Sequence, residues 1–517
     1  MNITKKLERK NLMKRRLCLL LALLMVMTTV FGLTSCKKKD GEGEETTVST
    51  TVGGGDAAGE PGSKDDPTLY EDLPTGDYKG YTFTFLNNIS DYANTTIVPT
   101  VTSDSVNQAM FQRNSFVKDK LKVNIAEERM KYADVKETMQ KLTTSQEFVY
   151  DAVYNEVQQQ TSLSTSGAYY SVEEYEEYIN LSKPWWFTDA MESLQVDGRG
   201  FELFGDLQLM YYDSIWGMTF NQKILADNHQ AYPYELVRKG EWTIDALKDI
   251  VAATAQEGSD ENYGVSSHKD WILAMISGSN FVLVEQDEDE VLKMYEDAET
   301  FVNVYTAIMN GFFLSNGEEG VNYIEAEYHT NSRDNDFPNI EDRENWGFQN
   351  IYRKGKSAFM AGTIGDIQMI RSAEFEYGIV PTPKYNKDQE QYVSWIFRGA
   401  ASCSIPAANP ELERTCTILE NLAAYSYKLV KYEYYDIVVQ TRTVRDNDSI
   451  EMLDIIFGHH EEIEGTPRFE MDSVYEIGIS NVIKKEMCDR STNIQSSIAG
   501  ASDVKKNIGK VIEGYKG

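Results

Sequence analysis

The residues of this chain best suited to nucleophilic or metal chemistry are its five cysteines and five histidines. Cys18 and Cys36 lie within and just after an apolar N-terminal segment, whereas Cys403, Cys416 and Cys488 have spacings that match no metal motif. An odd number of remaining cysteines does not indicate a disulfide framework, although one pair among them stays open. We expect all three to be buried, because free cysteine behaves as a small hydrophobe.

No short motif for catalysis or for phosphate or metal binding is complete in the sequence. There is no His-Glu-x-x-His, Gly-x-Ser-x-Gly or Cys-x-x-Cys. The run 355–357 (Gly-Lys-Ser) ends like a phosphate-binding loop, but Asn350 stands where the first glycine is needed. The acidic runs 287–290 and 334–336 lack the glycine and spaced glutamate of a calcium loop. We interpret them as solvated surface, with an adventitious calcium site as the alternative, and predict no cofactor and no metal.

Acidic residues dominate the charge of the chain. The formal net charge is −32, from 82 acidic and 50 basic residues. Residues 1–35 hold seven basic residues and one acidic residue, so the chain without them carries −38. Such a body argues against binding nucleic acid and against docking on a membrane through a basic patch. Neutral or polar ligands fit it better than polyanions.

A basic N-terminal end followed by an uncharged apolar stretch indicates a secretory segment. Residues 5–16 carry seven Lys and Arg, and residues 17–33 contain no charge. The run 33–36 (Leu-Thr-Ser-Cys) resembles the lipobox of bacterial lipoproteins. This resemblance implies cleavage after residue 35 and a lipid, such as palmitate, on Cys36. The alternatives are an incidental cysteine and a transmembrane helix, for which 17 uncharged residues are at the short limit.

A polar tract follows the cysteine. Residues 37–68 contain mostly Lys, Gly, Glu, Thr, Ser, Asp and Ala and no aromatic residue. Such a composition cannot bury enough apolar surface to order itself. We interpret residues 36–77 as the lipidated cysteine and a flexible tether with a mean reach of about 30 Å. The predicted location is therefore the extracellular face of the cell membrane, held there by a lipid anchor.

Behind the tether, the pattern of apolar residues predicts alternating strands and helices. Residues 81–85 alternate as a strand does, and a capping pattern at Ser105 predicts a helix that leads into a strand near 123–126. A second helix over 134–144 and a strand over 149–154 follow. This order favours the α/β class with a partly parallel sheet.

The later part of the chain has similar signals. Thr243 is predicted to be the N-cap of a helix over 244–255. Further helices are predicted near 291–309 and, behind Asn409-Pro410, to about residue 429. Residues 315–345 are polar and predict a surface loop, and about 80 residues at the end are predicted to be mainly helical.

Five short stretches, taken in their order along the chain, resemble the motifs of a known protein family. They are 180–186 (Asn-Leu-Ser-Lys-Pro-Trp-Trp), 220–225, 232–235 with 240–243, 355–362 and 377–384. Their order and spacing resemble the extracellular solute-binding proteins (family 1 type) of carbohydrate ABC importers, specifically the lipid-anchored kind of Gram-positive bacteria. The resemblance covers about residues 80–460. The insertion at 315–345 and some 50 residues at the end depart from the family pattern.

The resemblance implies a two-lobed α/β fold of the periplasmic-binding-protein type (type II), with lobes joined by hinge strands. By that analogy the first lobe comprises 78–208 and 384–435, and the second comprises 209–383 and 436–517, behind a signal peptide at 1–35. The ligand is expected in the cleft, at the carboxyl ends of the strands.

The resemblance also implies which residues bind the ligand. A sugar presents flat C–H faces and many hydroxyl groups, so its site needs aromatic platforms and charged hydrogen-bonding side chains. Carried over by the motifs, the ligand-binding residues are Glu156, Asp213, Trp216, Trp271, Asp366, Trp395, Arg398 and Arg442. Beside them in the sequence lie Asn155, His268, Asp270, Gly365 and Asp446. The alternative for each is ordinary packing or a surface ion pair.

Three further tryptophans are expected to be structural. Trp185 and Trp186 are predicted to pack at the surface of a lobe, and Trp242 to staple the start of a helix. The resemblance thus implies a monomeric receptor, not an enzyme, that captures a carbohydrate, by analogy an oligosaccharide, for an ABC permease. Two alternatives stay open. One is a surface carbohydrate-active enzyme, for which two carboxyl groups about 5–10 Å apart suffice. The other is a sensor or structural lipoprotein of the same fold.

Overall fold

The computed structural model describes residues 65–89, 96–100, 104–255, 263–286, 291–314, 323–325, 347–435 and 444–516. All of them belong to one compact unit, residues 58–517. The predicted signal peptide, Cys36, the tether up to residue 64, Arg442 and most of the 315–345 insertion lie outside the described residues. Among the helices of the described ranges, none is both long and apolar enough to cross a membrane.

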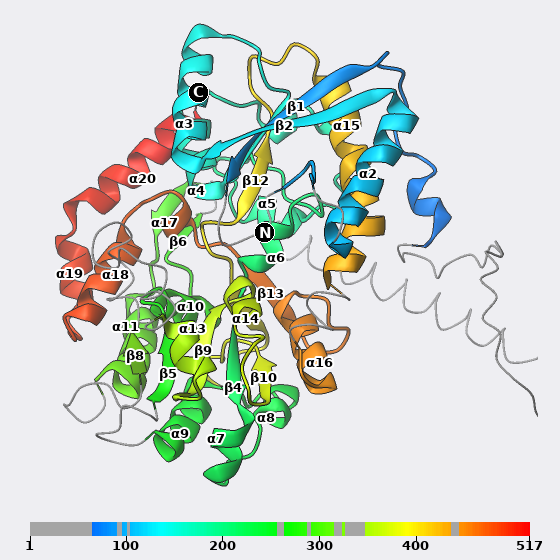
Figure 1. The fold of residues 1–517 in the computed structure, drawn as a ribbon. Helices are drawn as coiled ribbons and strands as arrows, with labels where there is room; N and C mark the ends of the chain where they lie inside the picture. The colour runs from blue at the N-terminus through cyan, green and yellow to red at the C-terminus, as the bar shows by residue number, and fades with distance from the viewer. Residues whose placement is uncertain are drawn as a thin grey trace, which may run out of the picture. The chain divides into compact units, whose positions relative to one another are not determined.

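The first sheet is mainly parallel, with the strand order β12-β3-β1-β2. Its strands are β1 (Tyr81–Ile89), β2 (Val123–Lys131), β3 (Ala152–Glu156) and β12 (Ala401–Ser404). β1 pairs in parallel with β2 and β3, which places Tyr81 beside Val123 and Phe85 beside Ala152. β12 runs antiparallel to β3. A strand from far along the chain therefore completes the sheet, which lies in the upper part of Figure 1.

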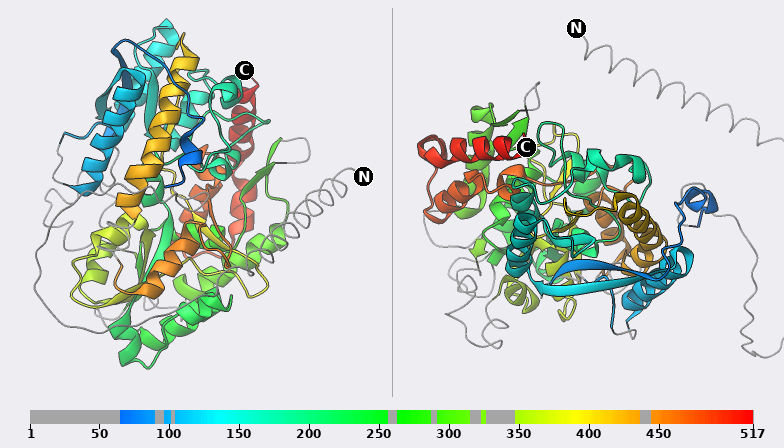
Figure 2. Two further views of the ribbon diagram at one scale, coloured as in Figure 1. Left: turned by 90° about the vertical axis from the view of Figure 1, so that its right-hand side faces the viewer. Right: turned by 90° about the horizontal axis from the view of Figure 1, so that it is seen from above.

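Helices connect and cover the strands of the first sheet. They are η1 (Pro67–Tyr70), α2 (Ser105–Leu121), α3 (Tyr132–Ser145), α4 (Val157–Ser164), α15 (Leu412–Tyr425) and the π-helix η7 (Ser426–Val430). Figure 2 shows α2 and α15 side by side, and Arg113 of α2, only 1% exposed, donates to Ser426 Oγ at 3.1 Å. The expected cap at Ser105 is wrong by one residue. Asp104 caps α2 instead, because its carboxylate accepts the N–H groups of residues 106 and 107.

The two tryptophans of the 180–186 motif are buried, which corrects the expectation that they pack at a lobe surface. They follow the short helices η2 (Val172–Glu174) and η3 (Glu176–Tyr178) and precede α5 (Thr188–Glu192). Trp185 is 0% and Trp186 5% exposed. Both indole N–H groups donate to the carboxylate of Glu420 on α15, at 2.9 and 3.0 Å. This buried acceptor explains their depth, since an indole needs a partner when water is excluded.

The second sheet is mixed, with the strand order β10-β4-β9-β5-β8. Its strands are β4 (Trp216–Asn221), β5 (Tyr263–Ser267), β8 (Tyr323–Glu325), β9 (Ser357–Thr363) and β10 (Tyr377–Val380). β4 runs antiparallel to β9 and β10, while β5 pairs in parallel with β8 and β9. We call the part of the chain packed around each sheet a lobe. The predicted residue boundaries of the lobes stay a prediction.

Helices of the second lobe surround this sheet. They are α7 (Gln222–Asp227), α8 (Tyr234–Arg238), α9 (Ile244–Thr254), α10 (Trp271–Gly278), α11 (Ala298–Ile308), the π-helix η4 (Met309–Phe313), α13 (Phe348–Arg353) and α14 (Ile364–Met369). Thr243 caps α9 as predicted, accepting the N–H of Ala246 at 3.3 Å. The helix predicted near 291–309 is partly wrong. Its beginning is the strand β7 (Leu292–Met294), which pairs with β6 (Val284–Gln286).

Two connections between the lobes run side by side. The first contains α6 (Leu209–Asp213) and enters β4, and the second contains β11 (Tyr392–Trp395), which pairs in parallel with β13 (Gly465–Arg468). Ile215 and Ile396 form an antiparallel bridge between the connections. Next to it, the N–H of Phe397 donates to the carbonyl of Ser214 at 2.9 Å. Residues that flank this bridge are therefore fixed relative to each other.

The end of the chain is mainly helical, as predicted. α16 (Asn447–Ile456) packs against β10 and β13. We call residues 471–516 the C-terminal arm; its helices are α17 (Met471–Val474), α18 (Ile479–Cys488), α19 (Ile494–Gly500) and α20 (Ser502–Tyr515). Figure 1 shows the arm in orange and red along one flank, from α11 of the second lobe up to α3 of the first.

The three cysteines of the folded part are free thiols. Cys403 and Cys416 are buried, as expected, whereas Cys488 is only half-buried. Burial raises the pKa of the Cys403 thiol to about 12. A thiol so far from its reactive thiolate form is chemically inert at neutral pH.

Candidate ligand-binding site

Two of the predicted site residues meet where the connections between the lobes run side by side. Trp216 begins β4 and Trp395 ends β11, and their ring centroids lie 5.5 Å apart with the planes tilted by 38°. Phe397 packs edge-on against Trp395 at 5.9 Å. The two indoles are 3% and 0% exposed, and neither N–H has an acceptor within the described part of the chain. Burying an N–H without an acceptor costs free energy, and a ligand oxygen that accepts this N–H would remove that cost.

Arg398 follows this aromatic group and lies between the lobes. Its Nε donates to Gln158 Oε1 on α4 of the first lobe at 3.1 Å. Its Nη1 lies 3.6 Å from the carboxylate of Asp270, which precedes α10 in the second lobe. The side chain keeps 27% of its surface exposed, so donors remain available to a ligand.

Asp270 is the most buried charge of this region, at 1% exposure. Lys484 of the C-terminal arm places its Nζ 2.9 Å from one carboxylate oxygen. His268 Nδ1 accepts the N–H of Asp270 at 3.0 Å. Burial alone would raise the pKa of the Asp270 carboxyl, but the surrounding Lys484, His268 and Arg398 outweigh it and hold the pKa below its ordinary value. Asp270 is therefore ionised at neutral pH.

Asp213, the next predicted residue, is held by two side chains that the sequence did not suggest. Its Oδ1 accepts a hydrogen bond from Gln368 Nε2 at 2.7 Å and another from the hydroxyl of Tyr434. Gln368 also donates to the Tyr434 oxygen at 3.0 Å. Asp213 is 7% exposed and ends α6, while Gln368 lies on α14. The three form one polar group at the entry to the second lobe.

Glu156 ends the strand β3, and Asp366 lies in the first turn of α14, just after β9. Asp366 completes a capping box with Thr363, accepting its N–H at 2.8 Å, and also accepts from Gln349 at 2.8 Å. Glu156 is the last residue of β3, where it pairs with Ala401 and is half-buried. The structure thus gives Asp366 a local role in starting α14, and a ligand contact by either carboxylate stays a prediction.

Trp271 is separated from the other two predicted tryptophans in its packing. It begins α10 and is 1% exposed. Its ring lies 5.1 Å from Phe312 and 5.7 Å from Phe313. The faces and edges that a sugar would use are occupied by these aromatic side chains in this structure, and contact with ligand stays a prediction, as it does for Arg442 outside the described residues.

Sequence reasoning missed four side chains that hold the predicted ones: Gln158, Gln368, Tyr434 and Lys484. Gln368 was the easiest to find, because it lies two residues beyond Asp366 in the same motif region. Lys484 was the hardest, since it lies in the C-terminal stretch that departs from the family pattern. No local spacing signals a contact across hundreds of residues.

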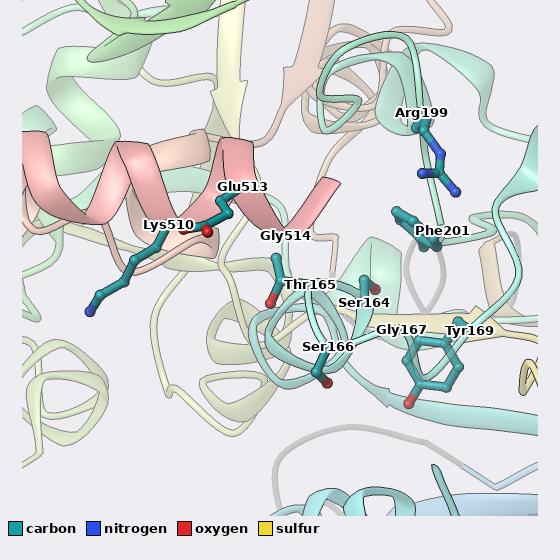
Figure 3. Close-up of a pocket in the computed structure, with 10 residues that line it drawn as sticks. All are labelled: Ser164, Thr165, Ser166, Gly167, Tyr169, Arg199, Phe201, Lys510, Glu513 and Gly514. Atoms are coloured by element: carbon teal, nitrogen blue, oxygen red, sulfur yellow. The ribbon is translucent and has the colours of Figure 1, made fainter. Parts of the chain in front are cut away.

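Two cavities of the structure lie away from this group. The larger, of about 550 Å³, is lined by ten residues on the loop after α4, around Arg199 and Phe201, and near the end of α20. Figure 3 shows Lys510 and Glu513 of α20 on one side of it and Arg199 on the other. The second, of about 350 Å³, is lined by residues of α3 and by 406–408. Neither is lined by a predicted site residue.

Comparison with known proteins identifies the fold. No protein-family model matches the sequence, and no curated protein matches it. The structure is similar to that of an ABC substrate-binding protein from Listeria monocytogenes in complex with cycloalternan, with 11% identity, a TM-score of 0.51, and 83% of this chain and 99% of that chain covered. Maltose-bound MalE3 of T. maritima is 12% identical, with a TM-score of 0.51, and the match covers 83% of this chain and 99% of that chain. UspC of M. tuberculosis is 11% identical, with a TM-score of 0.52, and the match covers 84% of this chain and 100% of that chain.

Identities this low establish the fold and nothing finer. The chain has the two-domain α/β fold of periplasmic-binding-protein-like solute-binding proteins, which confirms the predicted fold class. Proteins of this fold close two domains around a ligand by a hinge movement. The group around Trp216, Trp395 and Arg398 lies at the connections between the two lobes.

Proposed function

We propose that the protein is a lipid-anchored extracellular receptor that captures a carbohydrate, an oligosaccharide by analogy, between its lobes and delivers it to an ABC permease. It acts as a monomer, by binding and not by catalysis. The known structures of similar fold support the class of ligand, because they include proteins solved with cycloalternan, maltose and maltotetraose.

The observation that carries the proposal is the contact between Trp216 and Trp395. Each belongs to a different connection between the lobes, and their indole N–H groups have no acceptor among the described residues. Opening of the lobes would uncover the rings. A sugar could then stack on an aromatic face, while its hydroxyl oxygens accept the indole N–H groups.

Arg398 adds charged hydrogen-bond donors to this site. It contacts Gln158 of the first lobe and lies near Asp270 of the second. A ligand hydroxyl that accepts from this guanidinium would contact a side chain that reaches both lobes. Since a ligand shifts a conformational equilibrium only by its difference in affinity for the two states, contacts made in the closed state alone drive closure. The closed form would then dock on the permease.

Calorimetry on the full-length chain in detergent tests the proposal. The chain is titrated with maltose, maltotetraose, cycloalternan, cellobiose and xylotetraose, and the sugars are recovered and assayed for new reducing ends. We expect saturable binding of at least one sugar with no change in it. Release of reducing ends would show that the protein is an enzyme and not a receptor. Absence of binding to every sugar of the panel would contradict sugar capture.

The proposed anchor has a separate test. Expressed in a Gram-positive host, the chain should partition with the membrane and carry acyl groups on Cys36, as mass spectrometry of the N-terminal peptide would show. The variant Cys36→Ser should appear in the medium. A Cys36→Ser chain that stays in the membrane would point to an uncleaved transmembrane segment instead.

A further inference from the structure

The C-terminal arm contacts the first lobe through α4. The carbonyl of Val474 accepts a hydrogen bond from Thr161 Oγ1 at 3.2 Å. Glu476 Oε1 accepts from Gln158 Nε2 at 2.7 Å. Gln158 is also the residue whose Oε1 accepts from Arg398, so the arm touches the side chain that holds Arg398 on the first lobe.

The same arm contacts the second lobe through α18. This helix packs against α10, at whose start Asp270 lies. The Nζ of Lys484 lies 2.9 Å from Asp270 Oδ1, and the Lys484 side chain is only 11% exposed. Asp270 and Lys484 thus form a nearly buried ion pair between the second lobe and the arm.

Arg398 has two acceptors within reach, Gln158 Oε1 at 3.1 Å and the Asp270 carboxylate at 3.6 Å. A hydrogen bond to a carboxylate is roughly twice as strong as one to a neutral amide. Arg398 nevertheless makes its closer contact with the amide. Lys484 Nζ lies closer to the Asp270 carboxylate, at 2.9 Å, than Arg398 Nη1 does, at 3.6 Å.

We propose that Lys484 is a positioning residue of the inter-lobe site, which makes the C-terminal arm part of the binding machinery. By pairing with Asp270, Lys484 leaves the Arg398 guanidinium on Gln158, with donors directed to the ligand. This inference rests on the proposed function, in which Arg398 contacts the sugar. Without Lys484, Asp270 draws Arg398 into a direct ion pair and removes it from the ligand.

Substitution on α18 offers a matched control. Lys485 is the next residue of the same helix, but its pair with Asp489 lies in solvent, with side chains 71% and 56% exposed. The full-length chain and its variants Lys484→Met, Lys484→Arg and Lys485→Met are titrated by calorimetry with the five sugars of the panel. We expect Lys484→Met to weaken binding about tenfold, because Arg398 then pairs with Asp270 and no longer donates to the sugar. Lys484→Arg should restore most of the affinity, and Lys485→Met should leave it unchanged.

A double variant separates positioning from general stability. In the Arg398→Ala chain, adding Lys484→Met should change the affinity less than about twofold, since groups that act through one another are not additive. The lower melting temperature caused by Lys484→Met should persist in both backgrounds. Wild-type affinity in Lys484→Met, or an equal loss in the Arg398→Ala background, would overturn this inference alone. If the unmodified chain binds no sugar, the proposed function fails and this inference fails with it.

Discussion

The ring of Trp216 lies 5.5 Å from the ring of Trp395, although the two residues belong to different connections between the lobes. Next to this pair, Ile215, which precedes Trp216, forms an antiparallel bridge with Ile396, which follows Trp395. Any hinge movement that changes this bridge must change the surroundings of both indoles.

We therefore expect sugar binding to alter tryptophan fluorescence through this pair. Trp216→Phe and Trp395→Phe should each remove much of the change, because the substitution keeps the packing but loses the indole. Trp242→Phe is the control, since Trp242 is equally buried but donates to the carbonyl of Pro381 at 2.8 Å, within the second lobe. Emission spectra recorded during titration with the panel give the readout. A change that survives the first two substitutions would place the ligand elsewhere.

Glu420 is expected to be a major source of stability in the first lobe. Its carboxylate accepts from Trp185, from Trp186 and, at 3.2 Å, from the backbone N–H of Asn180. Glu420→Ala leaves these buried donors without an acceptor and should lower the free energy of unfolding by about 3 kcal/mol or more. Glu420→Gln keeps one acceptor oxygen and should cost less.

Urea denaturation monitored by circular dichroism measures this effect. The control is Glu413→Ala, on an exposed turn of the same helix, which should change stability by less than about 0.5 kcal/mol. Sugar affinity should be unchanged in every folded variant. Equal stability of Glu420→Ala and Glu413→Ala would show that the two indoles find other partners.

The parts of the fold that were predictable from sequence are those with local causes. Alternating apolar residues at 81–85 and the cap at Thr243 act over a few positions, and both are found as expected. The α/β class followed from the order of such elements. The two-lobed fold was predicted from the five motifs taken in order, because the periodicity of apolar residues does not by itself indicate two lobes.

The parts that were not predictable depend on contacts across the chain. Trp185 was expected to pack at the surface of a lobe, yet it is buried and Glu420 accepts its N–H from α15. Trp271 was chosen for its type and position, but Phe312 covers it from η4. Lys484 reaches Asp270 from the far end of the chain. The residue type predicts which interactions a side chain can make, whereas the tertiary fold determines which residues it contacts.

Stability should fall as the pH rises through the weakly acidic range, and Glu202 should contribute to this. Burial raises the pKa of its carboxyl from about 4.5 to about 7, partly offset by hydrogen bonds from Ser164 and Phe201. Between these two values the unfolded chain has lost the proton and the folded chain keeps it. The unfolded state therefore binds fewer protons, and stability decreases with pH across the window and levels off above it.

Glu202→Gln isolates this contribution, because an amide does not titrate. Relative to the unmodified chain, its free energy of unfolding should be nearly equal at pH 5 and higher by up to about 3 kcal/mol at pH 8. Burial also raises the pKa of Glu470 to about 7, so only the difference between variant and wild type is informative. Urea denaturation at the two pH values provides it, with exposed Glu413→Gln as control. A constant difference would mean that Glu202 is ionised in the folded state.

Two glycines of α20 should respond in opposite directions to the same substitution. A Cβ on Gly514 would lie 2.6 Å from Thr165 Cβ and 2.9 Å from its carbonyl oxygen, whereas a Cβ on Gly509 would meet nothing within 4 Å. Gly514→Ala forces the helix away from the first lobe and should destabilise the protein by about 1–3 kcal/mol. Gly509→Ala gains helix propensity and should stabilise it by up to about 1 kcal/mol.

Thermal unfolding gives the sign of each change, and hydrogen exchange of peptides from α20 locates it. Gly514→Ala should speed exchange in α20 and weaken the hydrogen bond in which Arg199 donates to the carbonyl of Tyr515 at 3.0 Å. Because the arm also carries Lys484, a displaced α20 should reduce sugar affinity as well. Stabilisation by both alanines would mean that α20 does not pack against Thr165, and the arm would then contact the first lobe only through α17 and the turn that follows it.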